Sequence, residues 1–205
     1  MMIFYLIVLS VLAYYFTLMF PVLYKKEKQN VIAQGEALIQ ETDDPGQYRV
    51  LAIVMFIMPV AIFSFSESML LSWFCFILAV VAYTDLSSRW IPDVAIYVLL
   101  VLSMLSIQNS DLNSALWSVL LYLLPAVLIS VYGFLVKKKT LIATGDYYVI
   151  PSIGLMILPE HASSLMLVNF IIVVAISRWI QKIPLVTVAY FTFTGYQLCL
   201  HSGLL

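Results

Sequence analysis

The chain has 205 residues, of which 63% are hydrophobic and 10% are charged, and its mean hydropathy is +1.04. Soluble globular domains carry charge on about a quarter of their residues, so this composition excludes an ordinary soluble domain and indicates a protein that lies in lipid. The formal net charge is −1, and no basic patch predicts a nucleic-acid partner. The placement of the few charges along the chain is more informative than their sum.

Eight apolar segments follow one another along the chain, and each is predicted to form a membrane helix because the runs are continuous rather than alternating. The expected fold class is therefore all-α, a polytopic membrane helix bundle of about eight transmembrane helices. We divide the chain into an N-terminal membrane anchor helix (1–24), a cytoplasmic loop (25–49) and a membrane-embedded domain (50–205). The predicted segments are Met2–Tyr24, Val50–Phe65, Met69–Thr84, Val94–Ile107, Ala115–Val136, Tyr147–Leu158, Ala162–Ser177 and Pro184–Leu200.

The first segment is predicted to be an uncleaved anchor. No Lys or Arg precedes it and positive charges follow it, which is the reverse of a secretory signal peptide. The stretch Lys25–Arg49 after it is the only sizeable polar stretch in the chain. Its apolar residues suggest a weakly amphipathic helix on the inner membrane surface; they are Val31, Ile32, Leu38 and Ile39.

The basic residues predict the orientation of the chain in the membrane. All of them fall in connections that follow odd-numbered segments, which a fold with eight spans places on one side. The positive-inside rule makes that side cytoplasmic, so both termini are expected on the other side. These residues are Lys25, Lys26, Lys28, Arg49, Arg89, Lys137, Lys138, Lys139, Arg178 and Lys182.

The side chains that commonly bind metals are sparse and far apart. Cys75 and Cys199, the only two cysteines, lie inside apolar segments, so neither a disulfide framework nor a Cys-x-x-Cys metal site is expected. His161 and His201 fall on the side opposite the basic connections. We therefore expect no metal and no cofactor.

A first acidic site follows the third segment. Asp85 ends that segment, where the helix macrodipole disfavours a negative charge, and an acid inside a membrane protein usually has a function. Pro92 then breaks any helix, and Asp93 is placed to cap the fourth segment. An alternative for Asp85 is a structural ion pair with Arg89, four residues further on, if the helix continues.

A second acidic site, Thr144-Gly145-Asp146, precedes the sixth segment. Gly145 permits a backbone conformation that other residues resist, and Asp146 opens the segment. A helix N-cap would alone explain an aspartate here, so the second site is informative mainly in combination with the first.

The segments that follow the two acidic sites are short. Tyr147–Leu158 has 12 residues and Val94–Ile107 has 14, about 18 Å and 21 Å as helices, against a hydrocarbon thickness of about 30 Å. If their inner ends begin below the membrane surface, the acids lie in a recess that water must fill, because irregular backbone at that depth cannot face lipid. We expect Asp85 and Asp146 to converge on a water-containing cavity open to the cytoplasm.

Two converging carboxyl groups have a defined chemistry. Like charges a few ångströms apart do not both form readily, so the pair shares one proton. The ionised member can take a proton from water, while the protonated member polarises a peptide carbonyl and later protonates the leaving amine. This is aspartyl peptidase chemistry, which requires no metal and no nucleophilic Ser or Cys.

The motifs resemble those of the type IV prepilin peptidase family, intramembrane aspartyl proteases of the Gly-x-Gly-Asp class. The resemblance covers roughly residues 50–200 and has three parts: Asp85–Asp93, Thr144–Asp146 and Lys182–Pro184. It implies Asp85 and Asp146 as the catalytic pair. The supporting motif positions that it implies are Gly145, Thr144, Arg89, Pro92 and Asp93.

The sequence also departs from the family pattern. Ala143 stands where the family has the first Gly of its second motif, and Tyr148 stands where Lys is often found. The Lys25–Arg49 loop lacks the cysteine pairs that longer members carry, which are associated with zinc and with N-methylation of the product. We therefore expect a short, peptidase-only form without methyltransferase activity.

The resemblance further implies a substrate and a location. The substrate would be a prepilin or pilin-like protein with a short basic leader before an apolar helix, and membrane lipid would be the other partner. The enzyme would lie in the bacterial inner membrane, with its active site facing the cytoplasm and both termini in the periplasm.

Two other functional classes remain open from the residues alone. A small proton-coupled transporter also places acids in the membrane, although transporters often show paired halves and the sequence shows no repeat. A structural membrane subunit, or an inactive relative of the peptidases, would make Asp85 and Asp146 dispensable.

Overall fold

Long apolar runs form helices in lipid because only a helix satisfies all the backbone polar groups within one segment. The computed structural model describes residues 2–34, 48–107, 111–138, 142–143, 145–177 and 184–204. Within this part of the chain it has eight α-helices, one π-helical turn and no strand. In chain order they are α1 (Met2–Gln34), α2 (Arg49–Ser66), α3 (Met69–Ser88), α4 (Asp93–Ile107), α5 (Leu112–Tyr132), η2 (Gly133–Lys137), α6 (Asp146–Gly154), α7 (Pro159–Ile176) and α8 (Leu185–His201).

Each predicted apolar segment contains most of one α-helix, which confirms the all-α polytopic bundle. The segment Ala115–Val136 also includes most of η2, and α6 ends at Gly154, before the predicted end at Leu158. Among the described residues, five spans are long and apolar enough to cross a membrane, namely those of α1, α2, α3, α5 with η2, and α7. Helices α8, α4 and α6 are shorter, with 17, 15 and 9 residues. Large apolar side chains such as Val50, Val94 and Phe134 are exposed on outward faces, as expected where the solvent is lipid.

The first helix is longer than predicted. Helix α1 continues through the basic residues that follow Tyr24 and ends at Gln34, so residues 25–34 extend the anchor instead of forming a separate surface helix. The remaining part of the predicted amphipathic helix, with Leu38 and Ile39, lies outside the described residues. Lys, Glu and Gln are good helix formers, so the polar composition of this stretch ends the hydropathic signal without ending the helix.

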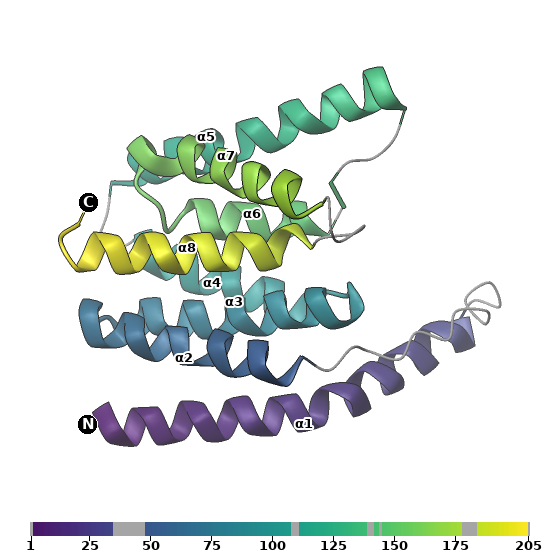
Figure 1. Ribbon diagram of the computed structural model, residues 1–205, viewed down its shortest axis with the longest axis vertical. Helices are drawn as coiled ribbons and strands as arrows, with labels where there is room; N and C mark the ends of the chain where they lie inside the picture. The colour runs from purple at the N-terminus through teal and green to yellow at the C-terminus, as the bar shows by residue number, and fades with distance from the viewer. Residues whose placement is uncertain are drawn as a thin grey trace.

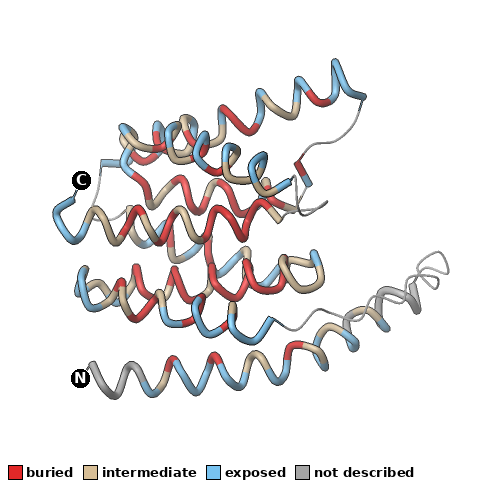
Figure 2. The backbone as a smooth tube through the Cα atoms, in the orientation of Figure 1, coloured by how far each residue is buried: buried red, intermediate tan, exposed pale blue. Residues whose placement is uncertain are grey.

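The helices form a bundle around α3 and α8. Helix α3 packs against α2, α4 and α8, while α5 packs against α6 and α7. Figure 1 shows both termini on one side of the bundle, with the C-terminal end of α1 and the N-terminal ends of α2, α6 and α8 on the other. Buried residues gather in the central helices (Figure 2): 67% of the most apolar stretch of α3 is buried, against 17% for α7. Helix α3 is therefore the central helix.

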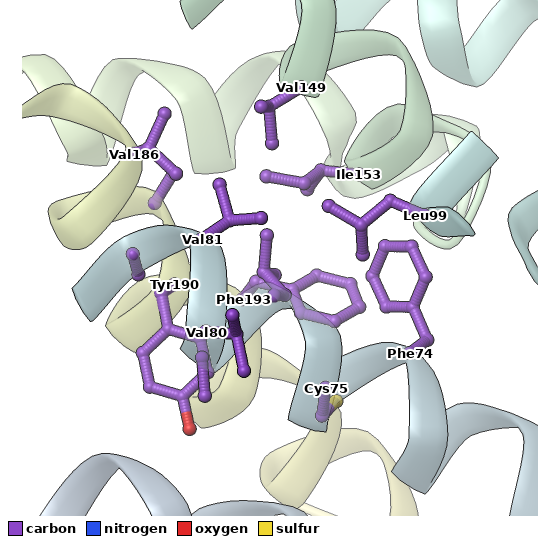
Figure 3. Packing of buried hydrophobic residues seen from close by; sticks show 14 of the residues in the cluster. Phe74, Cys75, Val80, Val81, Leu99, Val149, Ile153, Val186, Tyr190 and Phe193 are labelled. Atoms are coloured by element: carbon purple, nitrogen blue, oxygen red, sulfur yellow. The ribbon is translucent and has the colours of Figure 1, made fainter. Parts of the chain in front are cut away.

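The core of the bundle is apolar, and the part of it drawn in Figure 3 comes from α3, α4, α6 and α8. Phe74, Cys75 and Val81 come from α3, and all three are fully buried. They meet Leu99 of α4, and the other labelled members of this cluster are Val80, Val149, Ile153, Val186, Tyr190 and Phe193. Cys75 and Cys199 are both free thiols.

A group of polar side chains between α5, α7 and α8 is joined by hydrogen bonds. Asn169 of α7 donates a hydrogen bond to the Tyr122 hydroxyl of α5 at 3.0 Å and accepts one from Thr192 of α8. Interhelical hydrogen bonds of this kind stabilise membrane helix pairs by about 0.6–1.7 kcal/mol. They therefore help to hold α5, α7 and α8 together on the side of the bundle away from α1.

Candidate active site

Asp85 lies in the last turn of α3, which continues one turn beyond the predicted end at Thr84 and stops at Ser88. The Ser88 hydroxyl donates to the Thr84 carbonyl at 2.9 Å, and the Arg89 backbone N–H donates to the Asp85 carbonyl at 2.9 Å. Arg89 then ends the helix in the left-handed conformation, with φ of 54°. The turn thus holds a side chain that is only 6% exposed, an unusual burial for an aspartate.

Three groups act on the Asp85 carboxylate. The backbone N–H of Val186, in the first turn of α8, faces the carboxylate closely enough to favour its charged form, and the charges of Asp146 and Arg89 also act on it. Arg89 is exposed, and its positive charge acts on Asp85 in the opposite sense to the negative charge of Asp146. One carboxylate oxygen, Oδ2, is buried and has no hydrogen-bond partner among the described residues. A buried oxygen without a partner is expensive, and in a native protein it needs an explanation.

Asp146 is the first residue of α6 and is 5% exposed. Its backbone N–H donates to the Ala143 carbonyl at 3.2 Å. The next residue, Tyr147, fixes this end of α6 against α5, because its hydroxyl forms a hydrogen bond with the Ser130 hydroxyl and lies 3.4 Å from the Ala126 carbonyl. Two helices therefore determine where the Asp146 carboxylate lies.

The backbone of the second motif is more ordinary than predicted. Gly145 has φ of −60° and ψ of −35°, a right-handed helical conformation open to any residue, so the prediction of a conformation that other residues resist is wrong. Ala143 is not among the described residues with positive φ, so its conformation suits alanine as well as the glycine of the family pattern. Thr144 lies outside the described residues.

The two motifs touch one another. A Cβ added to Gly145 would lie 3.4 Å from Cδ1 of Ile91, in the stretch that follows α3, and α4 packs along α6. The charge of Asp146 also acts on Asp85, so the two carboxyl groups lie near one another at the ends of α3 and α6 that this contact joins. Nearby carboxyl groups are a requirement of a pair that shares one proton.

The remaining motif positions lie at the edge of this site. Pro92 precedes α4, and its carbonyl accepts from the Ala95 backbone N–H at 3.0 Å. Asp93 is the first residue of α4, and its side chain is exposed, where the helix macrodipole favours a negative charge. Lys182 and Ile183 of the third resembling feature lie outside the described residues, whereas Pro184 precedes the first turn of α8.

The helices that begin at the site are too short to span a membrane. Helix α4 has 15 residues and α6 has 9, about 22 Å and 14 Å at the usual rise, compared with a hydrocarbon core of about 30 Å.

An aromatic stripe on α1 also reaches the flanks of Asp85. Phe16, Phe20 and Tyr24 are spaced four residues apart, which places them on one face of the helix. Phe20 packs edge-on against Tyr83 with ring centroids 5.9 Å apart, and Tyr24 against Trp90 at 6.4 Å. This contact was not predicted from the sequence, although the i, i+4, i+8 spacing of the aromatic residues was a detectable signal.

The approach of Val186 to Asp85 was not predicted either, because the position of a backbone N–H cannot be inferred from residue type.

Within the described residues, no three His, Cys, Asp or Glu side chains gather in a group that could hold a metal ion. The comparisons with known proteins give one match. Residues 69–178, slightly more than half of the chain, match the model of the type IV leader peptidase family. The matched range runs from the start of α3 to just beyond α7 and includes both aspartates. Neither the curated proteins nor the solved structures gave a match.

Proposed function

The chain belongs to the type IV leader peptidase family, and from that premise we propose that it is an intramembrane aspartyl endopeptidase that removes the leader from type IV prepilins. The observation that carries this proposal is the meeting of two buried carboxyl groups, Asp85 and Asp146, whose charges interact at one end of the bundle. Two acids in one site favour proton transfer chemistry. The Asp85 Oδ2 atom, buried without a partner among the described residues, suits a site where a water molecule or a substrate atom is bound.

Hydrolysis by such a pair needs one shared proton. The ionised carboxylate takes a proton from water while the water oxygen bonds to the scissile carbonyl carbon, and the protonated carboxyl donates its proton to the carbonyl oxygen. The resulting gem-diol then loses a hydroxyl proton to the second carboxylate, as the first carboxyl protonates the amide nitrogen. The C–N bond breaks, a carboxylic acid and an amine leave, and the pair again holds one proton.

The substrate that suits this arrangement is a prepilin or pilin-like protein with a short basic leader followed by an apolar helix. Such a substrate lies in the membrane with its leader in the cytoplasm, so the bond to be cut lies near the inner boundary. The short helices α4 and α6 support a water-containing recess at that depth, because water must reach irregular backbone that lipid cannot solvate.

The proposed location is the bacterial inner membrane, with the active site facing the cytoplasm. Described basic residues flank the end of the bundle that carries the acids: Arg49 begins α2, Arg89 ends α3, and Lys137 ends η2. The positive-inside rule assigns this end to the cytoplasm, and both termini then lie in the periplasm (Figure 1). We propose no N-methyltransferase activity, since the Lys25–Arg49 loop contains no cysteine.

Processing of a type IV prepilin tests the proposal. The chain is co-expressed with a prepilin that has a basic leader, and the size of the pilin is followed on a gel. Asp85→Asn and Asp146→Asn keep the shape of the side chain but remove the carboxyl group that accepts and donates a proton. Each is therefore expected to slow cleavage by at least about 10²–10⁴-fold. Asp111→Asn is the matched control, because Asp111 is an exposed cap of α5 whose Oδ1 accepts from Asn113 and Asn caps equally well.

The outcomes separate the functional classes. Cleavage by wild type and the Asp111 variant, with none by the two dyad variants, supports the peptidase. Cleavage at the wild-type rate by either Asp85→Asn or Asp146→Asn contradicts the dyad mechanism. A chain that inserts and folds but never cleaves a prepilin favours the transporter or structural classes.

A further inference from the structure

The first turn of α8 is joined to the turn of α3 that carries Asp85. The Thr187 hydroxyl donates a hydrogen bond of 2.9 Å to the Ala82 carbonyl, across 105 positions of sequence. Both groups are buried, and Thr187 is only 7% exposed. Its neighbour Val186 presents its backbone N–H to the Asp85 carboxylate. Two adjacent residues of α8 therefore contact α3 within one helical turn of the acid.

These two contacts depend on one another geometrically. The N–H groups in the first turn of a helix have no acceptor within that helix, so the Val186 N–H is available to a partner outside α8. Its direction follows from the rotation of α8 about its own axis. The Thr187 bond to Ala82 fixes that rotation at the position next to Val186, and Pro184, the residue before the helix, provides no side-chain cap that would do so.

The consequence falls on the orientation of the carboxylate. One face of Asp85 is engaged by the Val186 N–H, while Oδ2 is buried without a partner among the described residues. A carboxylate that a backbone donor approaches from one fixed side presents its remaining oxygen in a fixed direction. Catalysis by proton transfer depends on such placement, and a displacement of about 1 Å can lower a rate by about 10²-fold.

We propose that Thr187 is a positioning residue of the peptidase: its hydrogen bond to the Ala82 carbonyl holds the Val186 N–H on Asp85 and so presents Oδ2 to the attacking water. This role rests on the proposed function. Thr187 lies outside the residues that match the family model, and it touches neither substrate nor water itself. Its effect is transmitted through the backbone of its neighbour.

A pair of substitutions at Thr187 tests the role. Thr187→Val keeps the volume and the β-branch but removes the hydroxyl, whereas Thr187→Ser keeps the hydroxyl. With a fluorogenic prepilin peptide in detergent or nanodiscs, we expect Thr187→Val to lower kcat about 10–100-fold with KM unchanged. Thr187→Ser is expected to restore kcat to within about 2–3-fold of wild type, since it keeps the bond to Ala82.

The matched control is Thr194→Val in the same helix. Thr194 is fully buried like Thr187, but its hydroxyl bonds to the Tyr190 and Phe191 carbonyls of α8 itself, at 2.9 and 3.1 Å. Both valine variants remove one buried hydroxyl from one helix, so a general loss of packing would affect them alike. Only Thr187→Val is expected to lose turnover while its melting temperature stays close to that of Thr194→Val.

Three outcomes overturn the proposal: wild-type kcat in Thr187→Val, equal losses in the two valine variants, or failure of Thr187→Ser to restore turnover. If Thr187→Val does not insert, Thr187→Ala, which is smaller and also lacks the hydroxyl, serves the same test. Failure of the proposed function is distinguishable. In that case wild type does not cleave, or Asp85→Asn does, whatever the Thr187 variants show.

Discussion

The last residue of α6, Gly154, sets how closely α6 approaches α5. A Cβ built on it would lie 2.9 Å from the Cα of Val119, 3.4 Å from Cγ2 of that residue and 3.5 Å from the Cβ of Tyr122. The nearest of these atoms is backbone, so a methyl group is accommodated only if the helices move apart. Overpacking of this kind destabilises a protein by about 1–3 kcal/mol. We expect Gly154→Ala to lower the free energy of unfolding by that amount.

The other glycines supply the contrast. At Gly145 the nearest atom to an added Cβ is the end of the Ile91 side chain at 3.4 Å, and at Gly195, inside α8, nothing lies within 4 Å. Gly145→Ala is therefore expected to change stability by less than about 0.5 kcal/mol, as for substitutions without a named destabilising mechanism. Gly195→Ala should gain about 0.5–1 kcal/mol because alanine restricts the unfolded chain.

The assay is thermal unfolding in detergent, followed by the fluorescence of the four tryptophans. In a chain of this length, a change of 1 kcal/mol in stability shifts the melting temperature by roughly 2–4 °C. The melting temperature should therefore be highest for Gly195→Ala, intermediate for Gly145→Ala and lowest for Gly154→Ala. A Gly154→Ala protein as stable as wild type would refute the close packing of α5 on α6. A large loss of stability in Gly145→Ala would instead indicate that position 145 needs a conformation open only to glycine, which the structure contradicts.

Two further predictions concern other parts of the bundle. Glu67 and Arg89 both end helices with positive φ, 53° and 54°, a conformation that is unfavourable by about 1–2 kcal/mol for residues with a side chain. Glu67→Gly and Arg89→Gly should therefore each raise the melting temperature. Only Arg89→Gly should alter turnover, because only that charge acts on Asp85, and equal activity in the two variants would contradict a role of Arg89 at the site. Asn169→Leu should lower the free energy of unfolding by about 1–2 kcal/mol, because it removes the hydrogen bonds with Tyr122 and Thr192. Adding Tyr122→Phe should lower it little further, since the second substitution removes the hydroxyl that the first leaves without a partner. Fully additive losses in chemical unfolding would contradict the pairing.

The helices were predictable because lipid makes apolar length the dominant signal. Helix α2 was predicted as Val50–Phe65 and spans Arg49–Ser66. Helix α6 ends at Gly154, before the predicted end at Leu158. The other main errors lie where polar residues continue a helix, as in α1 beyond Tyr24 and α3 beyond Thr84. The apolar run of the sequence ends at such points, whereas the backbone hydrogen bonds of the helix continue beyond them.

The site was predictable only in its side chains. The spacing and shared sidedness of Asp85 and Asp146 indicated a pair, and the structure brings their charges into interaction. The conformation of Gly145 was predicted wrongly, because a glycine also serves where small size is tolerated without a special φ. The contribution of α8 could not be foreseen, since it depends on a backbone N–H and on the partner of one threonine far away in sequence.

The central claim is that Asp85 and Asp146 face one another, and cross-linking tests it without reference to activity. In a chain with Cys75 and Cys199 replaced by alanine, cysteines are placed at positions 85 and 146, and a short bismaleimide is added to the membrane-embedded protein. A control pair at positions 69 and 146 moves the first cysteine to the opposite end of α3, about 24 Å away along the helix. We expect mass spectrometry to find the cross-linked peptides only for positions 85 and 146. Their absence there, with cross-linking in the control pair, would contradict the account.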